Sequence, residues 1–133
     1  MAFVFSQRSL NNLQGVHPKL VAVMTKVLEY SEYDFVVTEG VRSYERQVQL
    51  KNEGKSKTLK SYHLKHDDGY GHAVDVAALV PGANGKSTVS WDLKYYTKIN
   101  EAVQRAAKEL GVKITWGGSW KTFVDSPHFQ IEM

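Results

Sequence analysis

The chain has 133 residues, which suits one compact domain with a hydrophobic core, and residues 1–133 are predicted to form that single domain. It contains no cysteine, which excludes disulfides, thiolate nucleophiles and cysteine zinc sites, so His, Asp or Glu must bind any metal. The net charge is +3, and the basic residues are scattered rather than gathered in a stripe, which argues against nucleic-acid binding.

The first half of the chain is predicted to hold two helices and a strand. No apolar stretch is long enough for a signal peptide or a membrane span, so neither is expected. Apolar residues at helical spacing predict a helix over Pro18–Tyr30, with its proline in the first turn. Phe35–Thr38 predicts a short buried strand, and Ser43 can cap a helix that ends near Asn52.

The second half begins with a polar segment, residues 55–71, that predicts a long loop. Apolar patterning and turn residues then predict a strand over Ala73–Leu79, a turn over Pro81–Ser87, a helix from about Asp92 to Leu110, and strands at Val112–Thr115 and Phe129–Ile131. Helices and strands are mixed without a regular βαβ rhythm. The predicted fold is therefore α+β with a mainly antiparallel sheet.

Asp75 is the first residue that points to chemistry, because it interrupts an otherwise apolar strand. An unpaired carboxylate in that position is costly or shifts its pKa, and a bound metal ion would remove the cost. An ion pair with a Lys or Arg is the alternative. Because His63, His66 and His72 precede Asp75 closely in the sequence, histidine ligands are also at hand.

A second group of candidates lies near the C-terminus, in Asp125-Ser-Pro-His128. A catalytic zinc takes three protein ligands, and a distant His could complete a His and Asp pair. Strand alternation sets His128 and Gln130 on one face. Asp125 lies near enough to take a proton from an attacking water and pass it to a leaving amine, with an Asx-turn as the alternative.

Arg42 and Trp120 are candidates for contacts with a substrate. Arg42 follows a buried strand directly, where a guanidinium can bind a carboxylate or a developing oxyanion; a surface ion pair is the alternative. Trp120 follows two glycines and a serine and can line a groove. His17, just before Pro18, is interpreted as an ordinary hydrogen-bonded residue.

Several short motifs follow one another along the chain: Gly40-Val-Arg42-Ser43 with Gln47, Ser61-Tyr-His63, Gly71-His-Ala73-Val-Asp75, Trp120 and Asp125-Ser-Pro-His128-Phe129. In this order they resemble the superfamily of zinc D-alanyl-D-alanine carboxypeptidases and L-alanyl-D-glutamate endopeptidases, over nearly the whole chain. The short form is similar to phage endolysins of this group. The resemblance implies Zn²⁺ on His63, Asp75 and His128, Asp125 as general base, Arg42 stabilising the polarised carbonyl, and a small α+β fold.

For the endolysin branch, the resemblance implies hydrolysis of the L-alanyl-D-glutamate bond of peptidoglycan and host cell lysis. Two alternatives stay open: a D-alanyl-D-alanine carboxypeptidase or dipeptidase, and a zinc-containing wall-binding module without catalysis. The expected partner is bacterial peptidoglycan, with no nucleic acid and no membrane insertion, and the expected state is a monomer. The chain is expected in the host bacterial cytoplasm, reaching the wall through a separately made pore.

The sequence departs from the family's pattern between the first two proposed ligands. The family usually holds this His and Asp in one compact block, whereas extra residues here separate His63 from Gly71. The match of Ser61-Tyr-His63 favours His63 as the ligand, and His66 remains the alternative. Strand alternation turns His72 away from the face of Asp75, so His72 is left out of the site.

Overall fold

The computed structural model describes residues 3–55, 61–82, 85–120 and 124–132. In chain order its elements are α1 (Gln7–Asn12), α2 (Pro18–Tyr30), β1 (Asp34–Glu39), α3 (Tyr44–Asn52), β2 (Ala73–Pro81), β3 (Ser87–Ser90), α4 (Leu93–Leu110), β4 (Lys113–Trp116), the short 3-10 helix η1 (Gly117–Ser119) and β5 (His128–Glu132). Every pairing between these strands is antiparallel, which confirms the predicted α+β class.

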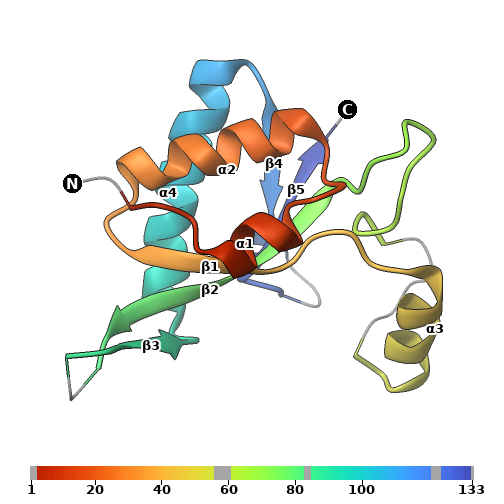
Figure 1. Ribbon diagram of the computed structural model, residues 1–133, viewed down its shortest axis with the longest axis horizontal. Helices are drawn as coiled ribbons and strands as arrows, with labels where there is room; N and C mark the ends of the chain where they lie inside the picture. The colour runs from red at the N-terminus through yellow and green to blue at the C-terminus, as the bar shows by residue number, and fades with distance from the viewer. Residues whose placement is uncertain (1–2, 56–60, 83–84, 121–123, 133) are drawn as a thin grey trace.

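The long strand β2 organises the sheet, because three other strands pair with it. β1 runs along one edge of β2, while β5 and β3 share the opposite edge, β5 at the beginning of β2 and β3 at its end. β4 pairs with the outer edge of β5, which gives the order β1-β2-β5-β4 (Figure 1). The last strand of the chain therefore lies inside the sheet.

The hydrophobic core fills the space between the sheet and the helices α2 and α4, which lie together over one face (Figure 1). Alternate residues of β2 and β5 point into it, among them Val74, Val76, Phe129 and Ile131, each at most 1% exposed. Because successive side chains of a strand point to opposite faces, the residues between them face away from the helices. Asp75 is one of these.

The two long helices form as the sequence predicts. α2 has the predicted bounds, and the Nδ1 atom of His17 accepts a hydrogen bond from the backbone N–H of Lys19 at its start. This is the ordinary role predicted for His17. The side chain of Asp92 caps α4, and Gly111 ends it with a left-handed φ of 69°, a conformation that favours glycine.

Helix α1 and strand β3 were not predicted. α1 has six residues, too few for an apolar period to emerge, and β3 is an exposed Ser-Thr-Val-Ser segment. The turn predicted over Pro81–Ser87 lies partly outside the described residues, and its first and last residues belong to β2 and β3. α1 matters for the sheet, because Ser9 Oγ accepts from the N–H of Val37 at 2.9 Å and Asn12 Nδ2 donates to its carbonyl at 2.8 Å. These two side chains occupy the backbone groups on the outer edge of β1.

The loop between α3 and β2, described from Ser61 onward, is tied to the N-terminal segment. The N–H of His17 donates to the carbonyl of Gly71 at 2.9 Å, and the N–H of Gly71 donates to the carbonyl of Gly15 at 3.0 Å. Residues 61–72, called the histidine loop below, thus have a defined path past the end of β1. Of the helices that the structure describes, none has the length and apolar character needed to cross a membrane.

Candidate metal centre

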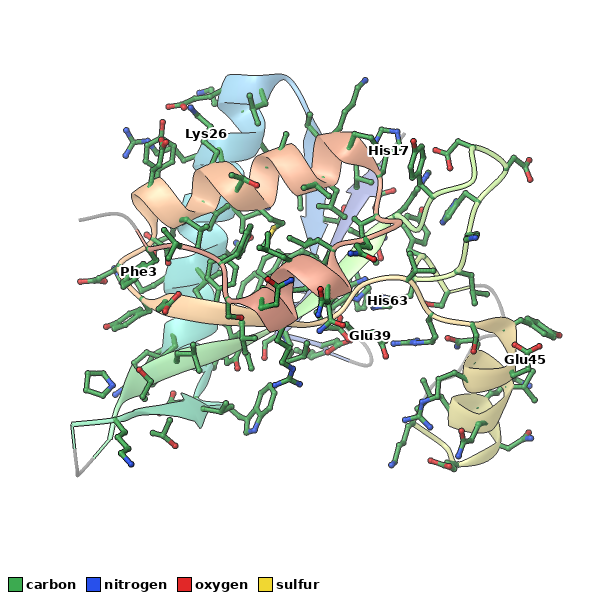
Figure 2. The ribbon with its side chains drawn as sticks, in the orientation of Figure 1. Phe3, His17, Lys26, Glu39, Glu45 and His63 are labelled. Atoms are coloured by element: carbon green, nitrogen blue, oxygen red, sulfur yellow. The ribbon has the colours of Figure 1, made fainter. Side chains whose placement is uncertain are left out.

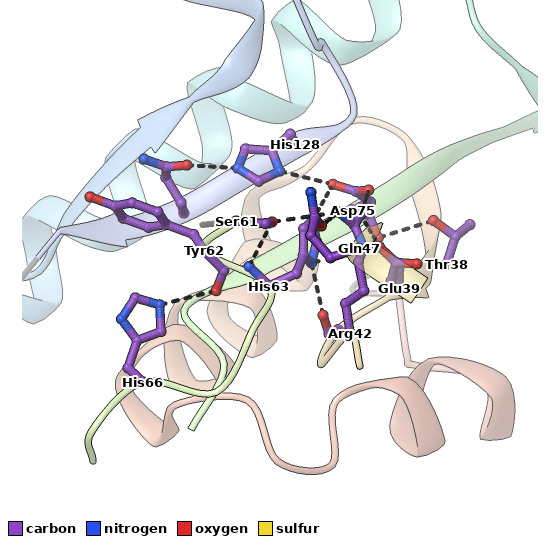
Figure 3. A network of polar contacts seen from close by, with 12 residues as sticks. Thr38, Glu39, Arg42, Gln47, Ser61, Tyr62, His63, His66, Asp75 and His128 are labelled. Atoms are coloured by element: carbon purple, nitrogen blue, oxygen red, sulfur yellow. Dashed lines mark hydrogen bonds and ion pairs between the residues drawn. The ribbon is translucent and has the colours of Figure 1, made fainter. Parts of the chain in front are cut away.

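Asp75 stands at the centre of the site, because the sheet register sets a functional residue on either side of it. Its Cα partners are His128 on β5 and Glu39 on β1. Directly opposed residues of an antiparallel pair project from the same face of the sheet. The ring of His128 accordingly places Nδ1 3.0 Å from Asp75 Oδ1 (Figure 3).

The second histidine at the site comes from the histidine loop. His63 is 2% exposed, and its Nε2 atom lies 3.1 Å from the same Oδ1 atom of Asp75. Its Nδ1 atom donates to the carbonyl of Gly40 at 2.8 Å, so Nε2 is the ring nitrogen that turns to the site. Gly40 must be glycine, because a Cβ would stand 2.0 Å from the carbonyl oxygen of Asn12.

The atoms that converge on this point form an acceptor-only cluster. His63 Nδ1 bonds to Gly40, and His128 Nε2 faces the side-chain carbonyl of Gln130 at 2.8 Å. In neutral imidazoles the other two nitrogens therefore direct lone pairs toward the carboxylate of Asp75. Such an arrangement is stable only with a proton or a cation between the groups.

The spacing of the three donor atoms suits a cation. They all lie within 4.8 Å of one another, and no other group of three His, Cys, Asp or Glu among the described residues meets this condition. A tetrahedral zinc with bonds of about 2.0–2.1 Å has ligand atoms about 3.3 Å apart. The observed separations of 3.0 and 3.1 Å are close to that value. The predicted ligands are thus brought together, and their donor set fits a divalent metal.

Electrostatics at the site favour a charged carboxylate. Burial alone would raise the pKa of Asp75, but in the absence of a metal ion the hydrogen bonds and charges of protonated His128 and His63 hold its pKa below the usual range. Burial alone would lower the pKa of His128, but the hydrogen bond to Asp75 and the charge of Asp75 raise it overall. Asp75 is therefore ionised at neutral pH, as metal binding requires.

Asp125 lies in the short turn before β5. Its backbone carbonyl accepts a hydrogen bond from the N–H of His128 at 3.1 Å, and this backbone contact closes the turn. The turn packs on Gly117, where a Cβ would stand 2.3 Å from the Asp125 carbonyl oxygen. Burial and the negative charge of Asp75 raise the pKa of the Asp125 carboxyl, whereas His128 and His63 oppose the rise.

Arg42 is held against the site by two residues that the sequence interpretation did not assign a role. Its Nε and Nη2 atoms donate to Oε1 of Glu39, the former at 2.7 Å, and Nη1 donates to Gln47 Oε1 at 2.7 Å. The Arg42 side chain is 11% exposed, and Nη2 lies 3.9 Å from Asp75 Oδ2. Arg42 is therefore a partly buried ion-pair residue beside the candidate metal centre. Its partner Glu39 lies next to His63 (Figure 2).

Two surface features lie near the site, an aromatic ring and a cavity. Trp120 stands next to His128, with ring centroids 5.2 Å apart. On the side of Arg42 there is a cavity of about 630 Å³, lined by Val41, Arg42, Ser43, Tyr44, Glu45, Leu64 and Lys65. Trp120 therefore contacts a residue of the candidate site directly, and the cavity reaches the site through Arg42.

The structure places His66 and His72 outside the metal centre. Their rings stack with centroids 3.6 Å apart, and His72 Nε2 lies 2.8 Å from Asp68 Oδ2. His66 Nε2 lies 3.3 Å from the carbonyl oxygen of Tyr62. The additional residues of the histidine loop thus build a separate polar cluster and leave His63 as the residue that reaches Asp75.

A buried His, Asp and His set with a carboxylate and an arginine beside it is typical of hydrolytic metal centres. The chain belongs to the phage L-alanyl-D-glutamate peptidase family, whose sequence pattern matches residues 1–132. This confirms the resemblance found in the motifs.

Individual relatives agree with the family. The crystal structure of the L-Ala D-Glu endopeptidase ChiX from Serratia marcescens superimposes with a TM-score of 0.84 at 48% identity, covering 96% of this chain and 89% of that chain. The L-alanyl-D-glutamate peptidase of Escherichia phage T5 is 34% identical over 94% of this chain and 87% of its own length. That of Listeria phage A118 is 35% identical over 98% of this chain but 43% of its own length.

Proposed function

We propose that the chain is a zinc peptidase that hydrolyses the L-alanyl-D-glutamate bond of peptidoglycan stem peptides, with Zn²⁺ held by His63, Asp75 and His128. The observation that carries the proposal is the acceptor-only cluster of these three side chains in a member of the L-alanyl-D-glutamate peptidase family. The cluster needs a proton or a cation between its groups, and the donor set of two imidazoles and one carboxylate suits zinc.

The side chains around the cluster have two proposed roles in the reaction, proton transfer and stabilisation of negative charge. When bound, Zn²⁺ supplies a Lewis acid that polarises the scissile carbonyl and lowers the pKa of a water molecule. Asp125 takes the proton of the attacking water and hands it to the leaving amine as the C–N bond breaks; its raised pKa suits both directions of transfer. Arg42, fixed by Glu39 and Gln47, stabilises the negative charge that develops on the carbonyl oxygen.

The surroundings favour an endopeptidase over the two alternatives. The cavity beside Arg42 offers room for a chain that continues beyond the scissile bond, which a dipeptidase does not need. Arg42, Lys65 and Glu45 among its lining residues offer charges of both signs to a stem peptide, and Trp120 offers an aromatic surface beside His128. A carboxylate at Asp125 beside the proposed metal ligand has no use in a module that only binds the wall.

The proposed setting is host cell lysis, with the chain made in the host bacterial cytoplasm and reaching the wall through a separately made pore. Membership of a phage family supports this setting. Expression with and without a pore-forming partner tests it, because only the combination should then lyse the cells.

Digestion of purified peptidoglycan, followed by mass spectrometry of the fragments, tests the proposed reaction. We expect fragments with a new N-terminal D-glutamate, no cleavage after chelation, and recovery on adding zinc. Chelation should also lower Tm, because a ligand that binds only the native state stabilises that state. Release of D-alanine alone would identify a carboxypeptidase, and binding without release would identify a wall-binding module. Full activity after exhaustive chelation would rule out the metal mechanism.

A further inference from the structure

A chain of hydrogen bonds runs away from the metal centre behind His128. His128 Nε2 faces Gln130 Oε1 at 2.8 Å, and Gln130 Nε2 donates to Glu132 Oε1 at 2.8 Å. Because the amide nitrogen of Gln130 is committed to Glu132, its carbonyl oxygen is the atom that meets the ring. Nε2 of His128 therefore carries the proton, and Nδ1 keeps its lone pair toward Asp75.

The same glutamate also contacts the loop that carries the other histidine. The Tyr62 hydroxyl donates to Glu132 Oε2 at 3.0 Å, and Tyr62 directly precedes His63 in the histidine loop. Figure 3 shows Tyr62 and His63 on one stretch of loop beside His128. The two carboxylate oxygens of Glu132 thus serve different segments: Oε1 serves β5 through Gln130, and Oε2 serves the histidine loop.

Glu132 is built into the sheet rather than lying free at its end. It is the Cα partner of Lys113 on β4. Burial raises the pKa of Glu132, but hydrogen bonds from Gln130, Thr115 and Tyr62 and the charge of Lys113 lower it overall. A charged acceptor makes stronger and more directional hydrogen bonds than a neutral one, so both segments are held firmly.

We propose that Glu132 is a positioning residue for both histidines of the metal centre, acting on His128 through Gln130 and on the His63 segment through Tyr62. The inference rests on the proposed metal site. Glu132 touches neither the donor atoms nor the substrate; it sets the tautomer and orientation of one ligand and the path of the loop that carries the other. Partners of this kind commonly change metal affinity by about 10–100-fold.

Zinc affinity of purified variants, measured by competition with a chromophoric chelator, tests the proposal without using activity. Glu132→Gln keeps the size of the side chain and removes its charge, and should weaken zinc binding about tenfold or more. Tyr62→Phe should weaken binding less, because it loses one of the two branches. In the double variant, Tyr62→Phe should add little, since its effect passes through Glu132. Glu101→Gln on the exposed side of α4 is the matched control and should bind zinc as the wild type does.

Nitrogen NMR of the histidine rings supplies a second readout. The zinc-loaded wild type should show His128 protonated at Nε2, and Glu132→Gln should broaden or shift that signal while Tm of the metal-free protein stays close to wild type. Unchanged zinc affinity and an unchanged His128 signal in Glu132→Gln would overturn the positioning role alone. A wild type that binds no zinc would overturn the metal site together with this inference, so the two failures are distinguishable.

Discussion

Two pairs of histidines contact each other in this structure, and they are organised in opposite ways. In the candidate metal centre, His63 and His128 meet edge to face and each turns one nitrogen to the same oxygen of Asp75. In the second group, His66 and His72 lie face to face, with planes only 6° apart. Stacked rings point their nitrogens sideways in parallel, so they cannot converge on one ion. Convergence, rather than the number of histidines, defines the candidate metal site.

The two groups also differ in what holds the far side of each ring. The far nitrogens of His63 and His128 bond to buried acceptors, the Gly40 carbonyl and the Gln130 side chain. The partner of His72 is Asp68, whose side chain is 35% exposed and open to water. A buried acceptor fixes the tautomer and the ring angle in advance, which lowers the cost of ordering a ligand when metal binds.

The largest expected difference between the two groups is seen when one histidine is removed from each. His63→Ala should give a zinc-poor, inactive protein, because it deletes one of three protein ligands. His66→Ala should keep zinc and most activity, since its ring lies outside the donor set. Bound zinc in the two purified variants decides the matter. The reverse pattern would make His66 the ligand and would mean that the histidine loop rearranges around metal.

Substitutions of Asp125 distinguish zinc binding from catalysis at the proposed metal centre. Asp125→Ala should leave zinc content near the wild-type level and lower kcat by about a hundredfold or more, the usual scale for a general acid–base group. Asp125→Asn, which keeps the shape of the side chain, serves as the matched variant and should lose activity equally. Loss of zinc in either variant would show that Asp125 is a ligand instead.

Arg42 offers a further test of what surrounds the donor set. Arg42→Ala should retain zinc and lower kcat by about a hundredfold, the scale expected for the loss of one oxyanion donor. Arg46→Ala, an exposed neighbour on α3, is the control and should keep wild-type turnover. A near-normal rate for Arg42→Ala would reduce Arg42 to an ion-pair partner of Glu39.

The smallest expected effect belongs to the second histidine group. The backbone N–H of Tyr70, the hydrogen bond with His72 and the charges of His72 and His17 hold the pKa of Asp68 below its usual value of 3.8. A lowered pKa stabilises the fold above that value, and the gain is lost as the pH falls through the folded pKa. Asp68→Asn should therefore lower Tm slightly at neutral pH, and the difference from wild type should shrink below pH 3.8. An equal difference at both pH values would argue against a charge effect.

The sequence was sufficient for elements with a long apolar period and for residues that break a pattern. Pro18–Tyr30 has the predicted bounds, and Asp75 is conspicuous in its apolar strand. The short α1 and the exposed β3 carry too few apolar residues to be recognised. At the site, the hydrogen bonds of Arg42 to Glu39 and Gln47 depend on a register shift in β1 and on the placement of α3. Both partners lie within five residues of Arg42 in the sequence, but no periodic pattern shows that the three side chains meet.

The side chains of Ser9 and Asn12 on α1 occupy backbone groups at the outer edge of β1, and this has a consequence for the behaviour of the protein at high concentration. An open strand edge is a template on which a second molecule can add its own strand, the first step toward aggregation. With the groups of Val37 already engaged, that edge offers a neighbour fewer free donors and acceptors. The six-residue helix α1 thereby disfavours edge-to-edge aggregation between copies of the protein.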